Sequence, residues 1–274
     1  MILTTPNTVQ AVRELEDAAR GTPLCRVQLC GPLVVRLNGR DLAGDIRGAQ
    51  GRIVFAYLLL NRTRRVTREE LAEALWGAYP PSEPAVAIRA LLSKLRATLE
   101  STGAAALPTG DWLRLHLPAD AEVDVEIAVQ ALHDAQSAVA SGEDVRAWIA
   151  AHIALNVSSR VLLEGADGEW IAGRRAALHE LRLRALEALS TCALRLGGPE
   201  LDTAVRTARE LIRLAPFRES GHAQLMRALT AQGNLAEAVL TYEKLRVLLR
   251  EELGMDPAPE LRALHTQLIK QRST

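Results

Sequence analysis

The second half of the chain repeats its apolar pattern at an interval of 34 residues, and this repeat most constrains the fold. At this shift Ala208 aligns with Tyr242, and four other positions keep their residue type: Leu201 with Leu235, Ala204 with Ala238, Leu211 with Leu245, and Leu214 with Leu248. Gly197-Gly198 and Gly233-Asn234 supply turns between helices. A repeat of this length, with small residues where helices would cross, predicts helix pairs that stack on one another.

The interval is that of the tetratricopeptide repeat, and we therefore predict an all-α tetratricopeptide-like domain over residues 122–274. Residues 125–157 have the spacing of an earlier, more divergent helix pair, and residues 256–271 would form a capping helix. Aromatic residues make up only 3% of the chain, so the helices must pack mainly through Leu, Ala, Val and Ile. This composition favours helices.

The first half of the chain changes from an alternating to a helical pattern. Apolar residues alternate between residues 27 and 37, and Asn38-Gly39 predicts a type I′ turn that closes a β-hairpin. Helical spacing begins at Arg52, and Thr67-Arg68-Glu69-Glu70 predicts a capping box at the start of a second helix. Pro84 suits the first turn of a third helix. These patterns predict a small sheet followed by three helices.

The elements occur in the order of a winged helix-turn-helix, which we predict over residues 24–121. Alternating Leu113, Leu115 and Leu117 follow the third helix and predict a second hairpin, the wing. The predicted fold class is mainly α: a winged helix-turn-helix with small antiparallel β-sheets, followed by the tetratricopeptide-like domain. Residues 1–23 are predicted to be an N-terminal extension, and the short helical pattern of residues 9–15 fits a packing arm or a leader segment.

The third helix has the pattern of a DNA-reading helix. Arg89, Ser93 and Arg96 lie on one face with Lys94 alongside, whereas the predicted buried face comprises Ile88, Leu91, Leu92, Leu95 and Leu99. Such a helix fits the major groove of DNA, where arginine can donate two hydrogen bonds to guanine. On any single helix these polar residues would be an ordinary solvated face, so the interpretation depends on the order of the elements.

The link between the first two helices is basic and suits contact with phosphates. The candidate residues are Arg52 in the first helix, the link residues Arg62, Arg64 and Arg65, Thr67 and Arg68 at the start of the second helix, and Arg114 in the wing. Residues 24–118 hold 13 Arg and Lys against 8 Asp and Glu, whereas residues 119–274 hold 18 against 22. A basic segment joined to an acidic one is typical of a nucleic-acid reader with a protein-facing module.

The motifs of catalysis, metal binding and cofactor binding are missing from the sequence. It has no glycine-rich phosphate loop, no Gly-x-Ser-x-Gly elbow and no His-Glu-x-x-His pair, and its six histidines are scattered. Cys25, Cys30 and Cys192 have no metal-ligand spacing and cannot all pair, which favours a reducing cytoplasm. Neither a signal peptide nor a membrane-spanning apolar run is present, so we expect a cytoplasmic protein. Because the catalytic motifs are missing, we also expect that the protein is not an enzyme.

Several short motifs occur in a fixed order along the chain, among them Leu92-Ser93-Lys94-Leu95-Arg96 and Glu252-Leu253-Gly254-Met255-Asp256-Pro257. The others are residues 66–71, 75–77, 80–81, 110–113, 123–124, 163–165, 168–170, 180–182, 225–229, 233, 237–238, 242 and 245. On these motifs, residues 27–125 resemble the winged-helix module of the OmpR/PhoB type, and residues 26–271 resemble the Streptomyces antibiotic regulatory protein family. The second half is similar to the bacterial transcriptional activator domain, a helical module of three repeats.

The resemblance implies a transcription activator that binds tandem direct repeats in double-stranded promoter DNA, as a homodimer, and contacts RNA polymerase. It assigns Ser93, Lys94 and Arg96 to the reading helix, and Thr67 and Arg68 to a helix start that contacts phosphate. The chain departs from the family in a reading helix rich in alanine, which occupies positions 85, 87, 90 and 97. Specificity would then come from spacing, DNA shape or partners.

Two questions stay open at the level of the sequence. The helical domain would hold a peptide, another subunit or a small-molecule ligand, or it would only complete the fold and dimerise. The alternative to an activator is a degenerate winged-helix scaffold or ligand sensor, which acts through protein or small-molecule binding instead of sequence-specific DNA binding. The two interpretations differ in salt dependence, because affinity that rests on phosphate contacts falls steeply as the salt concentration rises.

Overall fold

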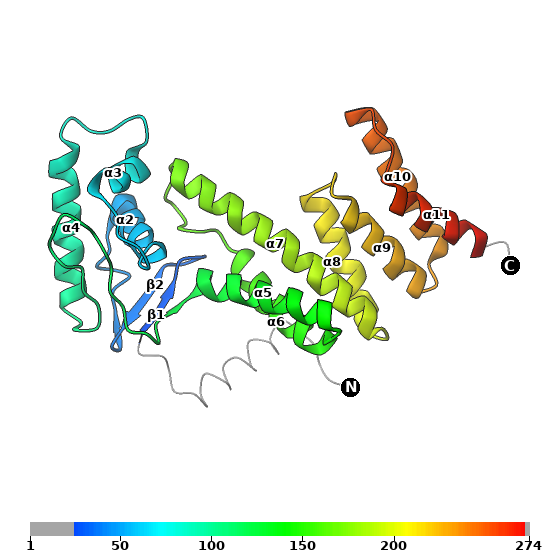
Figure 1. Ribbon diagram of the computed structural model, residues 1–274, viewed down its shortest axis with the longest axis horizontal. Helices are drawn as coiled ribbons and strands as arrows, with labels where there is room; N and C mark the ends of the chain where they lie inside the picture. Colours follow the sequence, from blue (N-terminus) through cyan, green and yellow to red (C-terminus); the bar gives the residue numbers. More distant parts are fainter. Residues whose placement is uncertain (1–24, 272–274) are drawn as a thin grey trace. The chain divides into compact units, whose positions relative to one another are not determined.

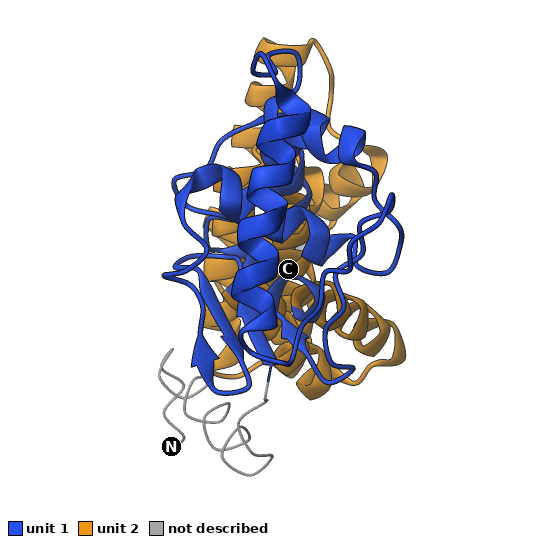
Figure 2. Cartoon of the chain, turned by 90° about the vertical axis from the view of Figure 1, so that its left-hand side faces the viewer, with its two compact units in different colours: residues 1–127, 157–178 blue, residues 128–156, 179–274 orange. Residues whose placement is uncertain are grey.

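The structure, a computed structural model, describes residues 25–271. The helical segment predicted at residues 9–15 lies outside the described residues. The chain divides into two compact units (Figure 2): unit 1 comprises Met1–Ile127 and Val157–Leu178, and unit 2 comprises Ala128–Asn156 and His179–Thr274. From the sequence we placed a domain boundary between residues 121 and 122, and that boundary stays a prediction.

Four short strands in the described part of unit 1 form a sheet in the order β3-β2-β1-β4. Figure 1 labels the two longer ones, β1 and β2. The strands are β1 (Cys25–Gln28), β2 (Val34–Leu37), β3 (Arg40–Asp41) and β4 (Glu122–Val123). β2 pairs antiparallel with both β1 and β3, as the alternating pattern predicted. Asn38 and Gly39, between β2 and β3, have φ angles of 47° and 76°, the positive values that a type I′ turn requires.

The sheet is mixed, and the prediction of antiparallel sheets was wrong at one edge. β4 pairs parallel to β1, with Val123 opposite Val27. Three helices lie between these two strands in the sequence. A connection of that length allows the chain to return in the direction of the strand that it left, which a short hairpin turn does not.

Among the described residues of unit 1, three helices precede β4: α2 (Gly48–Leu60), α3 (Arg68–Trp76) and α4 (Pro84–Glu100). All residues of α2 from Ile53 to Leu59 are buried, and a helix that is apolar all round belongs in the core. The capping box of α3 is confirmed. Thr67 Oγ1 accepts the Glu70 N–H at 3.0 Å, and Glu70 Oε1 accepts the Thr67 N–H at 3.4 Å.

The wing segment forms isolated bridges in place of the predicted hairpin of regular strands. Leu113 exchanges two backbone hydrogen bonds with Val66, at 2.8 and 2.9 Å, and His116 exchanges two with Ala106, at 2.8 and 3.0 Å. Leu113 and Leu115 are buried, as the alternation predicted, whereas Leu117 is only half-buried. The wing is therefore anchored to the residue that precedes the α3 cap.

Three helices contribute residues to both units: α5 (Asp124–Ser141), α6 (Asp144–Ser158) and α7 (Glu169–Leu196). Their parts in unit 2 pack largely through alanine, with Ala135, Ala151 and Ala188 in one buried cluster. Small side chains at these crossings let the helix backbones approach closely. This packing agrees with the divergent helix pair that was predicted over residues 125–157.

Unit 2 continues with α8 (Glu200–Leu214), α9 (Glu219–Ala231), α10 (Leu235–Leu253) and α11 (Pro259–Gln271). The central repeat positions are buried: Ala204, Ala208, Leu211, Ala238, Tyr242 and Leu245. α9 approaches α8 closely at Gly221, where a Cβ atom would lie 3.1 Å from Leu211 Cγ. The predicted tetratricopeptide-like helices are thus confirmed. Across residues 25–271, no helix combines the length and apolar character needed to cross a membrane.

Candidate nucleic-acid interface

The candidate reading helix α4 is held in unit 1 by one apolar face. Pro84 occupies its first turn, where the missing N–H of proline removes no helical hydrogen bond. The buried anchors are at most 6% exposed and comprise Ile88, Leu92, Leu95 and Leu99. Leu91, predicted to be buried with them, is half-buried. This packing leaves the opposite face of α4 to solvent.

The solvent face of α4 carries three of the four predicted reading residues. Arg89, Ser93 and Lys94 are exposed, and within residues 25–271 neither cation has an acidic partner. The Nε of Arg89 donates to the backbone oxygen of Ala85 at 3.2 Å, which lays the side chain along the helix. The Nη atoms of Arg89 have no partner among the described residues, so they are available to an acceptor outside the chain.

Arg96 lies differently from the other predicted reading residues. Its side chain is half-buried, and its Nε donates to the backbone oxygen of Leu107 at 2.9 Å. We predicted Arg96 on the outward face with Arg89, and the structure turns it toward the segment that leads into the wing. The fold brings the Leu107 carbonyl within reach of the guanidinium, and sequence spacing does not show this. The bond uses one of five N–H donors and fixes the direction of the others.

Two of the three link arginines already have carboxylate partners. Arg62 makes a two-pronged ion pair with Glu126, with 2.7 Å between Nη2 and Oε2. Arg64 Nη1 lies 2.6 Å from Glu70 Oε2, and this contact raises the pKa of Arg64 and lowers the pKa of Glu70. Arg65 is exposed and has no ion pair with a described residue. Of the predicted link contacts, Arg65 is therefore the cation best placed for phosphate.

Arg68 and Arg114 connect the wing to the α2–α3 region. Arg68 Nη2 donates to the backbone oxygen of Gly110 at 2.6 Å, and Arg114 Nε donates to that of Arg62 at 3.1 Å. Neither bond neutralises the guanidinium, because a backbone carbonyl carries no net charge. Both arginines therefore stiffen the wing and keep a positive charge beside it.

Arg52 and Thr67 are the predicted residues least suited to phosphate contact. Arg52 is half-buried, and its Nε has no hydrogen-bond partner among the described residues. The Thr67 hydroxyl oxygen is committed to the α3 cap, although its proton can still be donated. The structure thus brings Arg65, Arg68, Arg89, Ser93, Lys94 and Arg114 to the surface of the winged helix or its edge. It holds Arg62, Arg64, Thr67 and Arg96 in internal hydrogen bonds or ion pairs.

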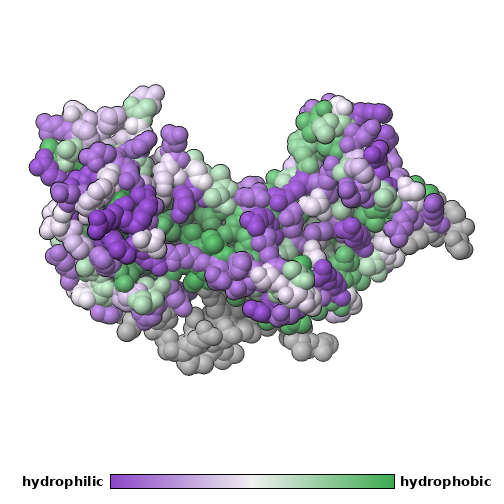
Figure 3. Space-filling model, viewed as in Figure 1, coloured by the Kyte–Doolittle hydropathy of each residue, from purple (hydrophilic) through white to green (hydrophobic). Residues whose placement is uncertain are grey.

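Sequence reasoning missed two exposed residues of unit 1. Arg47 is exposed immediately before α2, and its Nε donates only to the nearby backbone oxygen of Gly44 at 3.2 Å. Its position at the start of a helix, as in Thr67-Arg68, is the signal that would have found it. The second residue is Val86, which is 48% exposed on the outward face of α4. Figure 3 shows hydrophilic side chains over much of the face of unit 1 that it presents.

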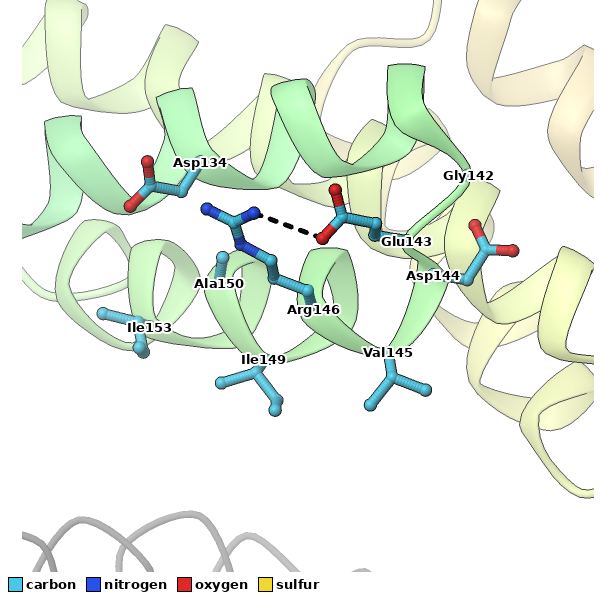
Figure 4. Close-up of a pocket in the computed structure, with 9 residues that line it drawn as sticks. All are labelled: Asp134, Gly142, Glu143, Asp144, Val145, Arg146, Ile149, Ala150 and Ile153. Atoms are coloured by element: carbon cyan, nitrogen blue, oxygen red, sulfur yellow. Dashed lines mark hydrogen bonds and ion pairs between the residues drawn. The ribbon is translucent and has the colours of Figure 1, made fainter.

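Surface hollows occur in unit 2, the part of the chain where a peptide or small ligand was predicted, and two of them are lined by described residues. The larger, of about 680 Å³, lies along α6 (Figure 4). Arg146 turns toward Glu143 there, with 3.2 Å between Nη1 and Oε2, while Val145 and Ile149 are 62% and 52% exposed. This hollow therefore combines an internally paired charge with exposed apolar side chains.

The smaller hollow, of about 320 Å³, lies between α8, the end of α9 and the start of α10. Arg209 pairs with Glu237 in its wall, and Gln232 donates to Asp202 at 2.7 Å. The opposite charges of Arg209 and Glu237 therefore already pair inside this hollow. The described part of the chain contains no group of three His, Cys, Asp or Glu residues able to hold a metal ion.

Comparison with known proteins agrees with this architecture. The profile of the family described as Bacterial transcriptional activator domain matches residues 123–269. Regulatory protein AfsR of Streptomyces coelicolor is 32% identical over 89% of this chain and 24% of AfsR. Transcriptional regulatory protein MoaR1 of Mycobacterium tuberculosis is 29% identical over 88% of this chain and 78% of MoaR1. The solved structure of Mycobacterium tuberculosis EmbR in complex with a low affinity phosphopeptide has a TM-score of 0.80 at 26% identity, over 90% of this chain and 65% of that one.

The matched profile covers more than half of the residues, and the chain therefore belongs to the bacterial transcriptional activator domain family. The predicted resemblance to the Streptomyces antibiotic regulatory proteins is confirmed. The likeness to EmbR extends beyond the helical domain, because it covers 90% of the chain and so includes much of the winged helix. The chain spans about a quarter of the length of AfsR.

Proposed function

We propose that this chain binds promoter DNA through α4 and the wing and activates transcription. The observation that carries the proposal is the outward face of α4, where Arg89 and Lys94 are exposed without acidic partners among the described residues. A helix-turn-helix places its reading helix in the major groove, with the first residues of that helix near the base edges. Arg65 and Arg114 would then contact the phosphate backbone on either side.

The proposal includes partners beyond DNA. The protein would occupy tandem direct repeats as a homodimer, contact RNA polymerase through unit 2, and work in the cytoplasm. Exposed apolar side chains on α6, Val145 and Ile149 among them, support a protein-facing role for unit 2, because exposed apolar surface is typical of protein contacts. The hollow along α6 would take a peptide or a small ligand.

Selection of bound sequences from random double-stranded DNA tests the proposal. At low salt we expect an enriched sequence that contains two direct repeats. The affinity for this sequence should fall steeply with salt, because each neutralised phosphate releases counterions. Recovery of no enriched sequence at low salt would contradict the proposal and favour a scaffold or ligand sensor.

A pair of variants makes the selection specific to α4. The double variant Arg89→Ala/Lys94→Ala should lose the enrichment, since it removes both exposed cations of the reading face. Arg227→Ala is the matched control, because Arg227 is an exposed arginine on α9 in unit 2. Enrichment that survives in the double variant would show that another surface reads the DNA.

A further inference from the structure

The outward face of α4 has an apolar centre between two cations. Val86 is 48% exposed, and Ala90, one helical turn later, is exposed as well. Side chains four residues apart lie on the same side of a helix, so Val86 and Ala90 form one contact surface. Arg89 and Lys94 lie on the two sides of this surface.

Val86 is not needed to anchor α4 in unit 1. Ile88, Leu92, Leu95 and Leu99 fill the core face, and each is nearly or fully buried. A half-exposed valine leaves apolar surface in water, which is unfavourable unless another molecule covers it. Val86 also lies in the first turn of α4, the part of a reading helix that comes nearest to the base edges.

We infer that Val86 and Ala90 recognise the C5-methyl groups of thymines in the major groove. Thymine presents a methyl group there that other bases lack, and apolar side chains recognise it by direct contact. Alanine at position 90 shortens the side chain between helix and base, so α4 can approach closely while Arg89 donates to a neighbouring guanine. This inference rests on the proposed function and adds the bases that the site would recognise.

The experiment uses the full chain and a sequence recovered by selection. Each thymine of the site is replaced in turn by deoxyuridine, which lacks the C5-methyl group and keeps the hydrogen-bonding groups. Replacement at one or two positions should weaken binding by about fourfold, the effect of removing one buried methyl group. Replacement at the other thymines should leave the affinity unchanged.

Val86→Ala assigns the effect to a residue. This variant should bind the thymine site less tightly and should no longer distinguish thymine from deoxyuridine at one of the sensitive positions. Val161→Ala is the matched control, because Val161 is 54% exposed in unit 1 but lies outside α4. The control should keep the full deoxyuridine effect, and thermal unfolding should show both variants to be as stable as the unmodified chain.

The outcomes separate the inference from the proposed function. Specific binding that is insensitive to deoxyuridine at every thymine would overturn the inference and leave the proposed function standing. A deoxyuridine effect that persists unchanged in Val86→Ala would overturn the assignment to Val86. If the unmodified chain binds no DNA sequence specifically at low salt, the proposed function and the inference are overturned together.

Discussion

The carboxylate of Asp124 accepts the backbone N–H of Cys30 at 2.8 Å. It also accepts the N–H of Leu29 at 3.0 Å and that of Val125 at 2.9 Å. The bonds from Leu29 and Cys30 join the first residue of α5 to the residues just after β1, with 94 positions of sequence between Cys30 and Asp124. The Val123-Asp124 pair thereby has two structural roles, since Val123 lies in β4 and Asp124 satisfies three backbone donors.

Asp124→Ala should lower the free energy of unfolding by about 3 kcal/mol, because three partly buried donors lose their acceptor. Asp124→Asn keeps one acceptor oxygen and should lose less. Chemical denaturation of both variants beside the unmodified chain measures the difference. Equal stability of Asp124→Ala and the unmodified chain would contradict the role given to this carboxylate.

Arg65→Ala should weaken DNA binding more than Arg64→Ala. Arg65 is exposed without an ion pair among the described residues, whereas Arg64 is held by Glu70. Loss of a phosphate contact should reduce affinity similarly on all sequences and lower the salt slope by about one. Binding isotherms at several salt concentrations test this pair, and a larger change in slope for Arg64→Ala would reverse the assignment.

Arg89→Ala and Arg96→Ala should have different signatures. Arg89 is exposed on α4, so its loss should cost roughly 1–3 kcal/mol of binding and relax the preference at one base pair. Arg96 donates to Leu107, so its loss should loosen the wing and weaken binding without a change in base preference. Repeating the DNA selection with each variant separates the two. A relaxed base preference in Arg96→Ala would make Arg96 a base contact.

Gly173→Ala and Gly221→Ala form a matched pair of helical glycines. At Gly173, in α7, an added Cβ meets no atom within 4 Å, and alanine should stabilise the fold by about 0.5–1 kcal/mol through helix propensity. At Gly221 the Cβ would lie 3.1 Å from Leu211 Cγ, so crowding should offset that gain. Thermal unfolding measures both, and an equal rise in Tm would show that α8 and α9 are not tightly packed at this point.

The fold should lose stability at acid pH because of His152. Burial lowers the pKa of His152 from 6.5 to about 4, helped by the positive charge of Arg206, and burial also lowers the pKa of His222. The unfolded chain therefore binds more protons than the folded one between about pH 6.5 and pH 4, and stability falls as the pH decreases through this window. For His152 alone the full loss is about 3 kcal/mol.

His152→Leu tests this dependence. The urea midpoint of the unmodified chain should fall between pH 7 and pH 5, and the variant should show a smaller fall. His179→Leu is the control, since His179 is exposed on α7, and it should behave like the unmodified chain. A pH dependence that is identical in His152→Leu would exclude His152 as its source.

Two features made by residues close together in the sequence were predicted correctly. The cap between Thr67 and Glu70 and the turn at Asn38-Gly39 were both confirmed, because each involves residues within three or four positions of one another. The central positions of the 34-residue repeat in α8 and α10 are likewise buried, whereas its outer positions are half-buried: Leu201, Leu214, Leu235 and Leu248. Helix and turn geometry fix such relationships before the chain meets any distant segment.

Pairings between distant residues were decided by the tertiary structure alone. The sequence shows the arginines of the link. It does not show that Glu126, 64 positions away, pairs with Arg62 while Arg65 stays exposed. A guanidinium binds whichever carboxylate the fold brings within about 3 Å, and spacing along the chain does not show that distance. The parallel pairing of β4 with β1 and the bridge between Val66 and Leu113 were not predicted for the same reason. The sequence by itself determined the class of fold and a set of candidate cations, and the fold determined which of them remain exposed and which are paired inside the chain.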